Sequence, residues 1–478
     1  MNNEANNEEN AARRTLQKLR EATSHTPYEG RLYLVGGLLR DRALGLPPTN
    51  DVDLVLEGDA VALARFLYER GVAQHYPVEY PRFGTAMIHV ADPASPQSIG
   101  SVVELVSARA ESYHADSRKP DVRQGTLHDD VYRRDFTINT LLENLHTGAA
   151  LDLTGRAFTD LNAGIIRTPL EPLVTFFDDP LRMLRALRFA ARFDFEIEAD
   201  TWQAICEEAE RLRPPQIAHE RIREEFVKIV KLPGRQLRRG LELLLASNLL
   251  ARFLPQMLPM VGCTQGSWHP YDVWTHTLVA VENLPDNAPL TTRLGLLWHD
   301  VGKPPTRTET PEGGIHFYGH PKVGADLTRA MMNHLKFPND ETRDVVVLVE
   351  KHMRLGEWKP DWTDATMKRL IRDCGDSLDS LFVLTRCDQL GAAIPPDEAV
   401  DLKALRARID TLNALSNVVL IDSPLDGNEI MAALGTGPGS YLREAKDFLT
   451  NEVIEGHLKE GDKDHARTLL LAWWATRN

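Results

Sequence analysis

The chain has 478 residues, of which 42% are hydrophobic and 26% are charged, and its formal net charge at pH 7 is −14. This length corresponds to roughly three or four domains, and the composition is that of an ordinary globular protein. The sequence has no apolar run long enough to span a membrane and no apolar signal segment near its polar N-terminus, so we expect a cytoplasmic protein without membrane contact.

The first part of the chain predicts a small mixed sheet with helices, an α+β unit that runs to about residue 155. Residues 1–12 are polar and are expected to be disordered, and 13–24 predict a short helix. The expected strands of the unit are 31–35, 51–58, 85–90 and 102–108, and the expected helices are 38–45 and 61–71.

The rest of the chain predicts helices. Between about 156 and 260, apolar residues recur every three or four positions, for example in 181–193, and Pro214-Pro215 marks a helix boundary. A His-rich helical region covers about 265–395, and the segment 396–478 is helical again, with turns at 422–427 and 435–440. The four cysteines form no CxxC pair, so we expect buried, reduced thiols rather than disulfides or a zinc knuckle.

Carboxylates on the early strands predict a magnesium site. Asp51 and Asp53 are two residues apart on one expected strand and therefore share a face. Two Mg²⁺ ions held there would clamp the attacking oxygen and the leaving pyrophosphate of a nucleotidyl transfer. Glu104 is the candidate third carboxylate, because it is a charge within an otherwise apolar strand and needs a partner.

The turn before these strands predicts a phosphate-binding segment. Gly36 and Gly37 end the first expected strand and would let the backbone approach a triphosphate closely. Arg40, on the following helix, could then contact phosphate. A solvated turn with incidental acids is the alternative, and the combination of both glycines with the Asp51/Asp53 pair argues against it.

From here the chain resembles the class II tRNA nucleotidyltransferase and bacterial poly(A) polymerase family, in the polymerase-beta-like superfamily. The resemblance implies a nucleotidyltransferase head followed by an all-α neck and body. Five motifs carry it in order along the chain: LVGGLLRDRALG…NDVDLVLEG for metal binding, RRDFTIN (133–139) for the ribose, DLTGRAFTDLNAGIIRTP (152–169) linking head and neck, DDPLRMLRALRFAARF (178–193) for the base, and ERIREEFVKIV (221–231) closing the neck.

The base-reading motif implies that Asp179 and Arg182 select the incoming nucleotide. They are three residues apart, so on a helix they would be neighbours on one face. One acceptor and one planar donor can pair with the edge of either C or A. The family pattern has Glu where this chain has Asp178, which puts only that position's role in question. The resemblance also assigns Arg185 and Arg188 of this motif to the nucleotide site.

The ribose-reading motif implies ribose and phosphate contacts by Arg133, Arg134 and Asp135, with Asn139 close by. Asp135 at the N-cap of a helix is the alternative. The polar segment 111–130 resembles the family's flexible loop, which is implicated in the switch from C to A addition. Its nearly full length favours CCA or A addition over CC-only addition.

A second group of metal-type residues lies in the His-rich region. His and Asp at such positions on helices can converge on one or two divalent ions. The group resembles the HD phosphohydrolase superfamily, and this implies an all-α HD domain. Four members of the group would bind a single ion, and the full set suffices for two ions bridged by Asp300. The candidate ligands are His276, His299, Asp300, His320, His352 and Asp388.

The HD resemblance implies hydrolysis of 2′,3′-cyclic phosphate or phosphate ends of RNA by a metal-activated water. The metal would be Mn, Ni, Co or Fe, or else Mg²⁺. Lys303 and Arg307 are the candidate phosphate contacts. Satisfied core histidines are the structural alternative for these positions, and a nucleotide-binding or oligomerisation scaffold without turnover is the functional one.

Basic residues recur after the head and could follow the phosphates of a tRNA acceptor stem, although a solvated helix face is an equal alternative. The net charge argues mildly against high affinity. The basic positions are Arg211, Arg213, Arg221, Arg223, Lys228, Lys231, Arg235, Arg238 and Arg239.

Together these patterns predict an enzyme that adds CCA to the 3′ end of tRNA from CTP and ATP, with an HD hydrolase behind it. A-adding, CC-adding and poly(A)-polymerase activities remain alternatives, as does an RNA-binding head that serves the hydrolase. The expected domains are a tail with a short helix (1–25), the head (26–155), the neck and body (156–262), the HD domain (263–395) and a helical C-terminal tail (396–478).

Overall fold

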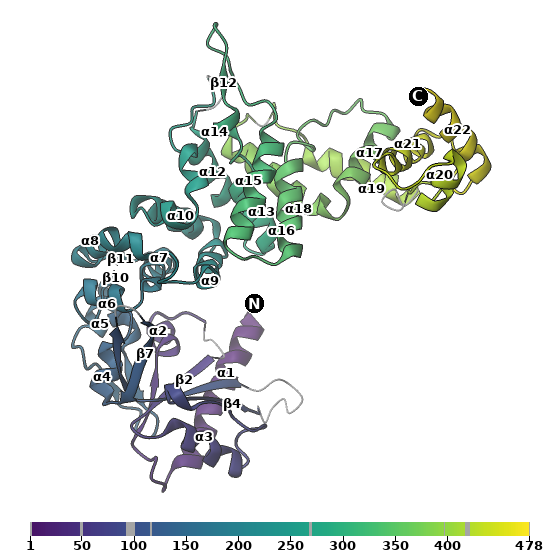
Figure 1. Ribbon diagram of the computed structural model, residues 1–478. Helices are drawn as coiled ribbons and strands as arrows, with labels where there is room; N and C mark the ends of the chain where they lie inside the picture. Colours follow the sequence, from purple (N-terminus) through teal and green to yellow (C-terminus); the bar gives the residue numbers. More distant parts are fainter. Residues whose placement is uncertain are drawn as a thin grey trace. The chain divides into compact units, whose positions relative to one another are not determined.

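The computed structural model describes residues 2–47, 51–91, 101–114, 117–266, 270–395, 397–415 and 421–477. The chain forms two compact units (Figure 1). Unit 1 contains residues 1–229 and 239–255, and unit 2 contains 230–238 and 256–478. No helix among the described residues is long and apolar enough to cross a membrane.

The chain begins with a helix, so the expectation of disorder over residues 1–12 is wrong. Helix α1 spans Asn2–Thr23. Its second half carries Ala12, Thr15 and Leu19, all buried and spaced at helical intervals on one face. The Thr15 hydroxyl donates to Ser101 Oγ at 3.0 Å. Packing of this stripe, together with the high helix propensity of Ala and Glu, stabilises a segment whose composition alone is polar.

Unit 1 is built on a mixed sheet, as the strand pattern predicts. The sheet order is β3-β4-β5-β2-β1-β8-β9, with β2 and β5 parallel and the other pairs antiparallel. The strand pattern gives no sign of β3, β8 and β9, which have only two or three residues each. The strands are β1 (Leu32–Val35), β2 (Asp51–Leu56), β3 (Val78–Tyr80), β4 (Thr85–Val90), β5 (Ser101–Ser107), β8 (Leu142–Asn144) and β9 (Ala150–Leu151).

Two expected helices flank this sheet. Helix α2 is Gly37–Ala43, and α3 is Ala60–Glu69. Helix α3 packs on β4 and β5. Asp59 caps α3 by accepting hydrogen bonds from the N–H groups of Val61 and Ala62.

The segment expected as a polar loop over 111–130 contains regular structure. Strands β6 (Arg109–His114) and β7 (Ser117–Gln124) form an antiparallel hairpin, and α4 (Leu127–Tyr132) follows with a capping box at Thr126. Residues 115–116 and the side chains of 110–122 lie outside the described residues. Hydrogen bonds between the two strands satisfy the backbone N–H and C=O groups of this hairpin although the sequence here is polar. Composition alone therefore does not reveal the hairpin.

The helical part of unit 1 follows, with the short parallel pair β10 (Ile165–Ile166) and β11 (Glu196–Ile197). Phe136, Phe176, Phe226 and Phe253 are fully buried in its core. Pro214-Pro215 lies between helices, as expected. The helices are α5 (Ala157–Ala163), α6 (Pro172–Asp178), α7 (Leu181–Phe193), α8 (Ala199–Glu208), α9 (His219–Val230), α10 (Gly234–Ala246), which contributes to both units, and α11 (Leu250–Phe253).

The first helices of unit 2 surround Trp298 and Arg293, both fully buried. The Arg293 guanidinium donates to backbone carbonyls, including Leu232 O at 2.7 Å, which satisfies a buried charge. These elements are α12 (Val273–Glu282), α13 (Leu290–Trp298), α14 (Lys303–Thr306), the hairpin β12 (Thr308–Glu309) and β13 (Ile315–His316), α15 (His320–His334), α16 (Asn339–Lys351), α17 (Asp364–Cys374) and α18 (Leu378–Gly391).

The C-terminal helices have a core of their own around Ile430, Leu449 and Leu470. They are α20 (Gly427–Leu434), α21 (Tyr441–Glu455) and α22 (Lys463–Ala475), whereas the preceding α19 (Leu402–Leu415) packs on α17. The cysteines are free thiols, as expected. Cys206 is exposed rather than buried, however, because it lies on the outer face of α8.

Candidate active sites

Two carboxylates are neighbours on the central parallel strands of the head. The register of β2 and β5 pairs Asp53 with Glu104, so their side chains leave the sheet on the same face. Glu104 is exposed, not a buried charge in need of a partner as its apolar strand suggests. Asp51 begins β2 opposite Val102, and its side chain lies outside the described residues.

The glycine turn lies directly against this carboxylate pair. Gly36 has φ of 81°, which favours glycine, and a Cβ there would lie 3.2 Å from Asp53 Oδ2. A larger residue would therefore crowd the Asp53 carboxylate. Gly37 begins α2. The expected approach of this backbone to a triphosphate stays a prediction.

Arg40 is buried, which corrects its expected contact with phosphate. Its guanidinium donates to Asp41 Oδ1 at 2.6 Å and to Asn139 Oδ1 at 2.7 Å, and it lies over the rings of Phe189 and Phe193. With these partners the arginine ties α2 to the ribose motif and to α7. The sequence pattern does not reveal these contacts of Arg40, because it does not show which side chains are buried.

The ribose motif is held by a buried carboxylate. Asp135 accepts hydrogen bonds from the Asn139 amide at 2.9 Å and from Arg185 Nη2 at 2.6 Å. Burial raises the pKa of Asp135, but Arg185 and Asn139 outweigh it and lower that pKa from 3.8 to about 2. Asp135 caps no α-helix, because the turn after it is the short 3₁₀ segment Thr137–Asn139. The preceding Arg133 and Arg134 both pair with buried Asp130.

A row of arginines along α7 joins the head to the neck within unit 1. Arg182, Arg185, Arg188 and Arg192 are three or four residues apart and therefore lie along one side of the helix. Arg188 Nε donates to buried Glu225 of α9 at 2.7 Å. Arg192 pairs with Asp41 of α2 at 3.1 Å, as Arg185 does with Asp135.

Asp179 and Arg182, the candidate base-reading residues, do not share a helix, and this corrects the expected i, i+3 arrangement. Helix α6 ends before Asp179, which has extended backbone angles of −144° and 98°, and α7 begins after Pro180. Proline forces the residue before it out of the helical region. Asp179 pairs with Arg221 at 2.9 Å, whereas Arg182 donates to the Arg133 carbonyl at 2.7 Å. Both side chains are thus fixed by other elements.

Most of the basic positions after the head have acidic partners. Arg211 pairs with Glu208, Lys228 with Glu225, and Arg239 with both Asp194 and Glu196. These ion pairs fit the solvated-face alternative for much of the set. Lys231 and Arg235 are exposed.

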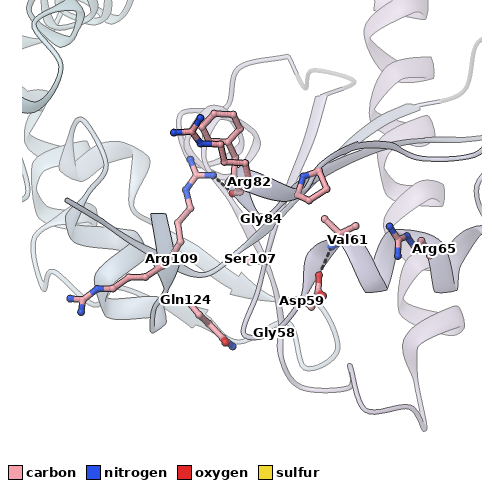
Figure 2. Close-up of a pocket in the computed structure, with 12 residues that line it drawn as sticks. Gly58, Asp59, Val61, Arg65, Arg82, Gly84, Ser107, Arg109 and Gln124 are labelled. Atoms are coloured by element: carbon pink, nitrogen blue, oxygen red, sulfur yellow. Dashed lines mark hydrogen bonds between the residues drawn. The ribbon is translucent and has the colours of Figure 1, made fainter. Parts of the chain in front are cut away.

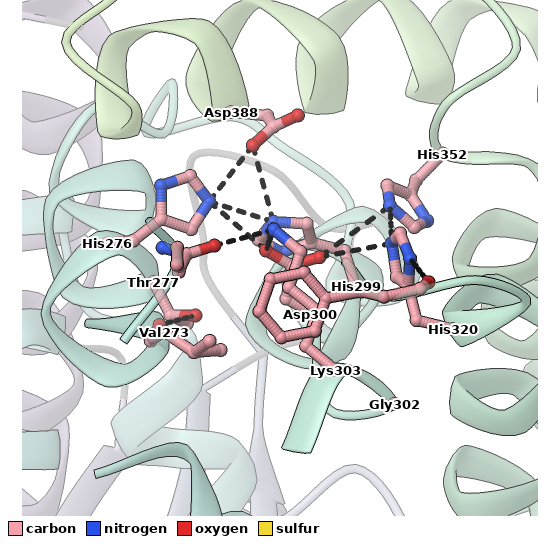
Figure 3. Close-up of polar contacts among 12 residues, drawn as sticks. Val273, His276, Thr277, His299, Asp300, Gly302, Lys303, His320, His352 and Asp388 are labelled. Atoms are coloured by element: carbon pink, nitrogen blue, oxygen red, sulfur yellow. Dashed lines mark hydrogen bonds and ion pairs between the residues drawn. The ribbon is translucent and has the colours of Figure 1, made fainter. Parts of the chain in front are cut away.

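The candidate metal ligands of unit 2 converge on Asp300 (Figure 3). His276 of α12 and His299 at the end of α13 place their Nε2 atoms 3.5 and 3.2 Å from Asp300 Oδ2. Asp388 of α18 lies 3.0 Å from His276 Nε2. This first group is fully buried except for Asp388, which is partly exposed.

The second group approaches the other oxygen of the same carboxylate. His320 at the start of α15 and His352 after α16 place Nε2 3.4 and 3.8 Å from Asp300 Oδ1. A bridging role for Asp300 therefore fits, with one oxygen toward each group. Two triads that share Asp300 could each hold a metal ion, since the ligand atoms within each lie within 4.8 Å of one another: His276, His299 and Asp300, and Asp300, His320 and His352.

Backbone carbonyls orient three of these histidines. The Nδ1 atoms of His299, His320 and His352 lie 2.7, 2.9 and 2.7 Å from the carbonyls of Leu296, Phe317 and Val349. An Nδ1–H donor leaves the lone pair of Nε2 directed at Asp300, which is the ligand tautomer. Asp300 Oδ1 is buried without a hydrogen-bond partner, and that orphaned oxygen fits a cation site.

The electrostatics of this cluster favour a cation as well. Burial lowers the pKa of His299, but Asp300 and Asp388 outweigh it and raise that pKa to about 10. Burial and the neighbouring His299 lower the pKa of His352 to about 4. The carboxylates thus draw one positive charge into the cluster, and a metal ion would compete with that proton for the same atoms.

The two expected phosphate contacts have different surroundings. Lys303 Nζ lies 2.6 Å from Asp300 Oδ2 and donates to Gln265 Oε1 at 2.7 Å, so it belongs to the site. Arg307 instead contacts Thr264 and Glu309. The sequence gives no sign of Gln265, nor of Gly302, whose missing side chain lets α14 approach the His320 carbonyl.

Three family models match successive parts of the chain. The Poly A polymerase head domain matches residues 32–167, the probable RNA and SrmB-binding site of polymerase A matches 194–260, and the HD domain matches 267–405. The CC-adding tRNA nucleotidyltransferase of Thermus thermophilus is 34% identical over 73% of this chain and 78% of its own length. The chain belongs to the tRNA nucleotidyltransferase family.

Other relatives in this family are named for the addition of different nucleotides. The A-adding tRNA nucleotidyltransferase of Deinococcus radiodurans is 33% identical over 73% of the chain and 79% of its own length. The multifunctional CCA protein of Laribacter hongkongensis is 33% identical over 75% and 84%. The resemblance and the α+β head followed by helical regions are thereby confirmed. A Bacillus stearothermophilus CCA-adding enzyme shares the fold, with a TM-score of 0.65 at 22% identity over 96% of this chain and 97% of that one.

Proposed function

We propose that this protein adds CCA to the 3′ end of tRNA, using CTP and ATP. The observation that carries the proposal is the pairing of Asp53 with Glu104 on parallel strands, with Gly36 directly against them. Relatives that add CC, A or CCA support the same reaction class.

In this proposal Asp51, Asp53 and Glu104 hold Mg²⁺, which stabilises the charge that develops on the reacting phosphate. The 3′-hydroxyl oxygen of the tRNA forms a bond to the α-phosphorus and loses its proton to solvent, the bond from the α-phosphorus to the oxygen that bridges to the β-phosphate breaks, and pyrophosphate leaves with that oxygen. Gly36 and Gly37 let the backbone approach the triphosphate. The buried Asp135–Arg185 pair keeps the ribose motif in place beside α7.

We further propose that Asp179 and Arg182 read the base from the break between α6 and α7. Asp179 supplies acceptors for the exocyclic amine shared by C and A, and Arg182 donates to the neighbouring ring nitrogen. Arg221 and the Arg133 carbonyl hold the two side chains in advance, so their conformational entropy is already lost when the nucleotide binds.

The nucleotide that is added is tested with tRNA that ends at the discriminator base. CCA should form only when labelled CTP and ATP are both present, and Asp53→Asn should lower the rate by at least about a thousandfold because a metal ligand is lost. Asp200→Asn, at an exposed position of α8 in the same unit, is the control. If the product formed with both nucleotides present is only A or only CC, or is a long A tail, the corresponding alternative replaces the CCA assignment.

For unit 2 we propose an HD phosphohydrolase acting on 2′,3′-cyclic phosphate or phosphate ends of RNA. Asp300 would bridge two divalent ions, with His276, His299 and Asp388 on one side and His320 and His352 on the other. Such ions act as Lewis acids on phosphate and activate water. Lys303 is placed to neutralise substrate charge, and the metal is proposed as Mn, Ni, Co, Fe or Mg²⁺.

The hydrolase is tested with His299→Ala, assayed on 2′,3′-cyclic AMP. We expect phosphodiesterase activity and bound metal to be lost while CCA addition persists, because the two sets of residues lie in different units. His334→Ala, in the last turn of α15, is the matched control and should keep both activities. Unchanged hydrolysis in His299→Ala would overturn the assignment.

A further inference from the structure

A second polar hollow lies on the head, at the far ends of the strands that carry Asp53 and Glu104. It has a volume of about 460 Å³ and is lined by four arginines, which we call the arginine pocket: Arg65, Arg82, Arg109 and Arg123. Arg65 lies on one side of the pocket and Arg109 on the other (Figure 2). Among the lining residues the only acid is Asp59.

Part of this wall is fixed by contacts with the protein. Arg65 makes two hydrogen bonds to Glu79, at 2.7 and 2.6 Å. Arg109 donates to the Phe83 carbonyl at 2.6 Å. Asp59 accepts from the first N–H groups of α3, so its charge is partly satisfied by that helix. These groups define the shape of the pocket before any ligand enters.

The other two arginines are open to a ligand. Arg82 and Arg123 are exposed, and within the described part of the chain neither has a hydrogen bond or an ion pair, although Arg123 is near enough to Asp129 to help lower the pKa of that carboxyl. Arg82 lies near the ring of its neighbour Phe83, and Arg123 belongs to β7, a different element. Arg82 and Arg123 come from separate elements and line the same hollow, and planar guanidinium groups match the oxygens of phosphate.

We propose that the arginine pocket binds a phosphate group outside the nucleotidyl-transfer site. The lining Ser107 is paired with Leu56 at the strand ends, three residues beyond the Asp53/Glu104 pair. At 3.3 Å per residue this separation is about 10 Å, so a phosphate here is distinct from the one that reacts. An RNA backbone and the phosphate chain of a free nucleotide both supply this chemistry.

The proposal is tested by binding, without any turnover. Arg82→Gln and Arg123→Gln are each compared with Arg13→Gln, which removes the same charge at an exposed position of α1. If the ligand is RNA, each pocket variant should lower the slope of log affinity for tRNA against log salt by about 0.7 to 0.9. If the ligand is a free phosphate chain, each variant should weaken binding of inorganic tripolyphosphate, measured by calorimetry, and leave the tRNA slope unchanged.

Either result supports phosphate binding at the arginine pocket and shows whether the phosphate belongs to RNA or to a free phosphate chain. The proposal is overturned if both pocket variants match Arg13→Gln in both assays. All three side chains are exposed, so the unfolding temperatures should agree and loss of fold cannot account for a difference. Because no nucleotide is added in these assays, the outcome does not depend on the proposed CCA addition.

Discussion

At the residue scale, the head depends on buried charges that are satisfied by one another. Asp135, Arg185 and Arg188 lie together with Glu225, which accepts from Arg188 and from Lys228. Leaving one member unpaired in such a cluster is costly, because the remaining charge has already lost its water. The arginine spacing of α7 is visible in the sequence, whereas the partners come from α2, α9 and the ribose motif and are not.

Asp135→Asn should therefore destabilise unit 1 in a pH-dependent way. The pKa of Asp135 is lowered from 3.8 to about 2, so its contribution is present above pH 3.8 and lost as pH falls through about 2. We expect the variant to lose about 2 kcal/mol of unfolding free energy at pH 7 and progressively less below pH 4. Urea unfolding across this range measures it, with exposed Asp200→Asn as control. A difference that does not vary with pH would contradict the ion pair.

At the element scale, the HD site depends on how closely α14 and α15 approach. A Cβ on Gly302 would overlap the His320 carbonyl oxygen and lie 2.6 Å from the Gly324 nitrogen. Both atoms belong to backbone, which cannot rotate away as a flexible side chain can. The helices must separate to admit any larger residue, and His320 would move with α15 relative to Asp300.

Gly302→Ala should accordingly weaken both the fold and the metal site of unit 2. Overpacking of this kind costs about 1–3 kcal/mol, so we expect a lower unfolding temperature together with reduced metal content and hydrolysis. Gly427→Ala is the matched control, because a Cβ there meets nothing within 4 Å. Full metal content in Gly302→Ala would show that the ligands tolerate separation of the helices.

At the scale of the whole molecule, the two proposed chemistries lie in separate compact units. All six candidate HD ligands belong to unit 2, and the strand carboxylates, the ribose motif and the base readers belong to unit 1. A ligand that binds one folded unit stabilises that unit by mass action. The two sites should therefore respond to different ligands.

Removal of the HD-site metal should destabilise unit 2. At a metal concentration about 100 times its Kd, binding adds about 2.7 kcal/mol to stability. Because a chelator also removes the Mg²⁺ proposed for the head, scanning calorimetry with and without a chelator is run on the wild type and on Asp300→Asn, and the shift that this variant abolishes should be confined to one transition. An equal shift of every transition would contradict independent stabilisation of the two units.

The sequence by itself determines the chemistry of this protein. Alternating and helical patterns predict the main strands and helices, because hydrophobic period follows directly from which face is buried. The order of Gly36-Gly37, Asp51, Asp53 and the RRD and DDPLR motifs indicates the family, and the His/Asp series indicates the HD region. Each motif is local, and the order of the motifs along the chain can be read without knowing which of them meet in space.

Only the tertiary structure decides how each of these residues is used. It buries Arg40 against Asn139, separates Asp179 from Arg182 at Pro180, and pairs Asp53 with Glu104 across two strands. It divides the HD ligands between the two oxygens of Asp300 and brings Arg82 and Arg123 to one pocket. Apart from the break at Pro180, which follows from the local restriction on a residue before proline, each of these contacts joins residues distant in sequence or depends on burial, and neither property is encoded in a local pattern.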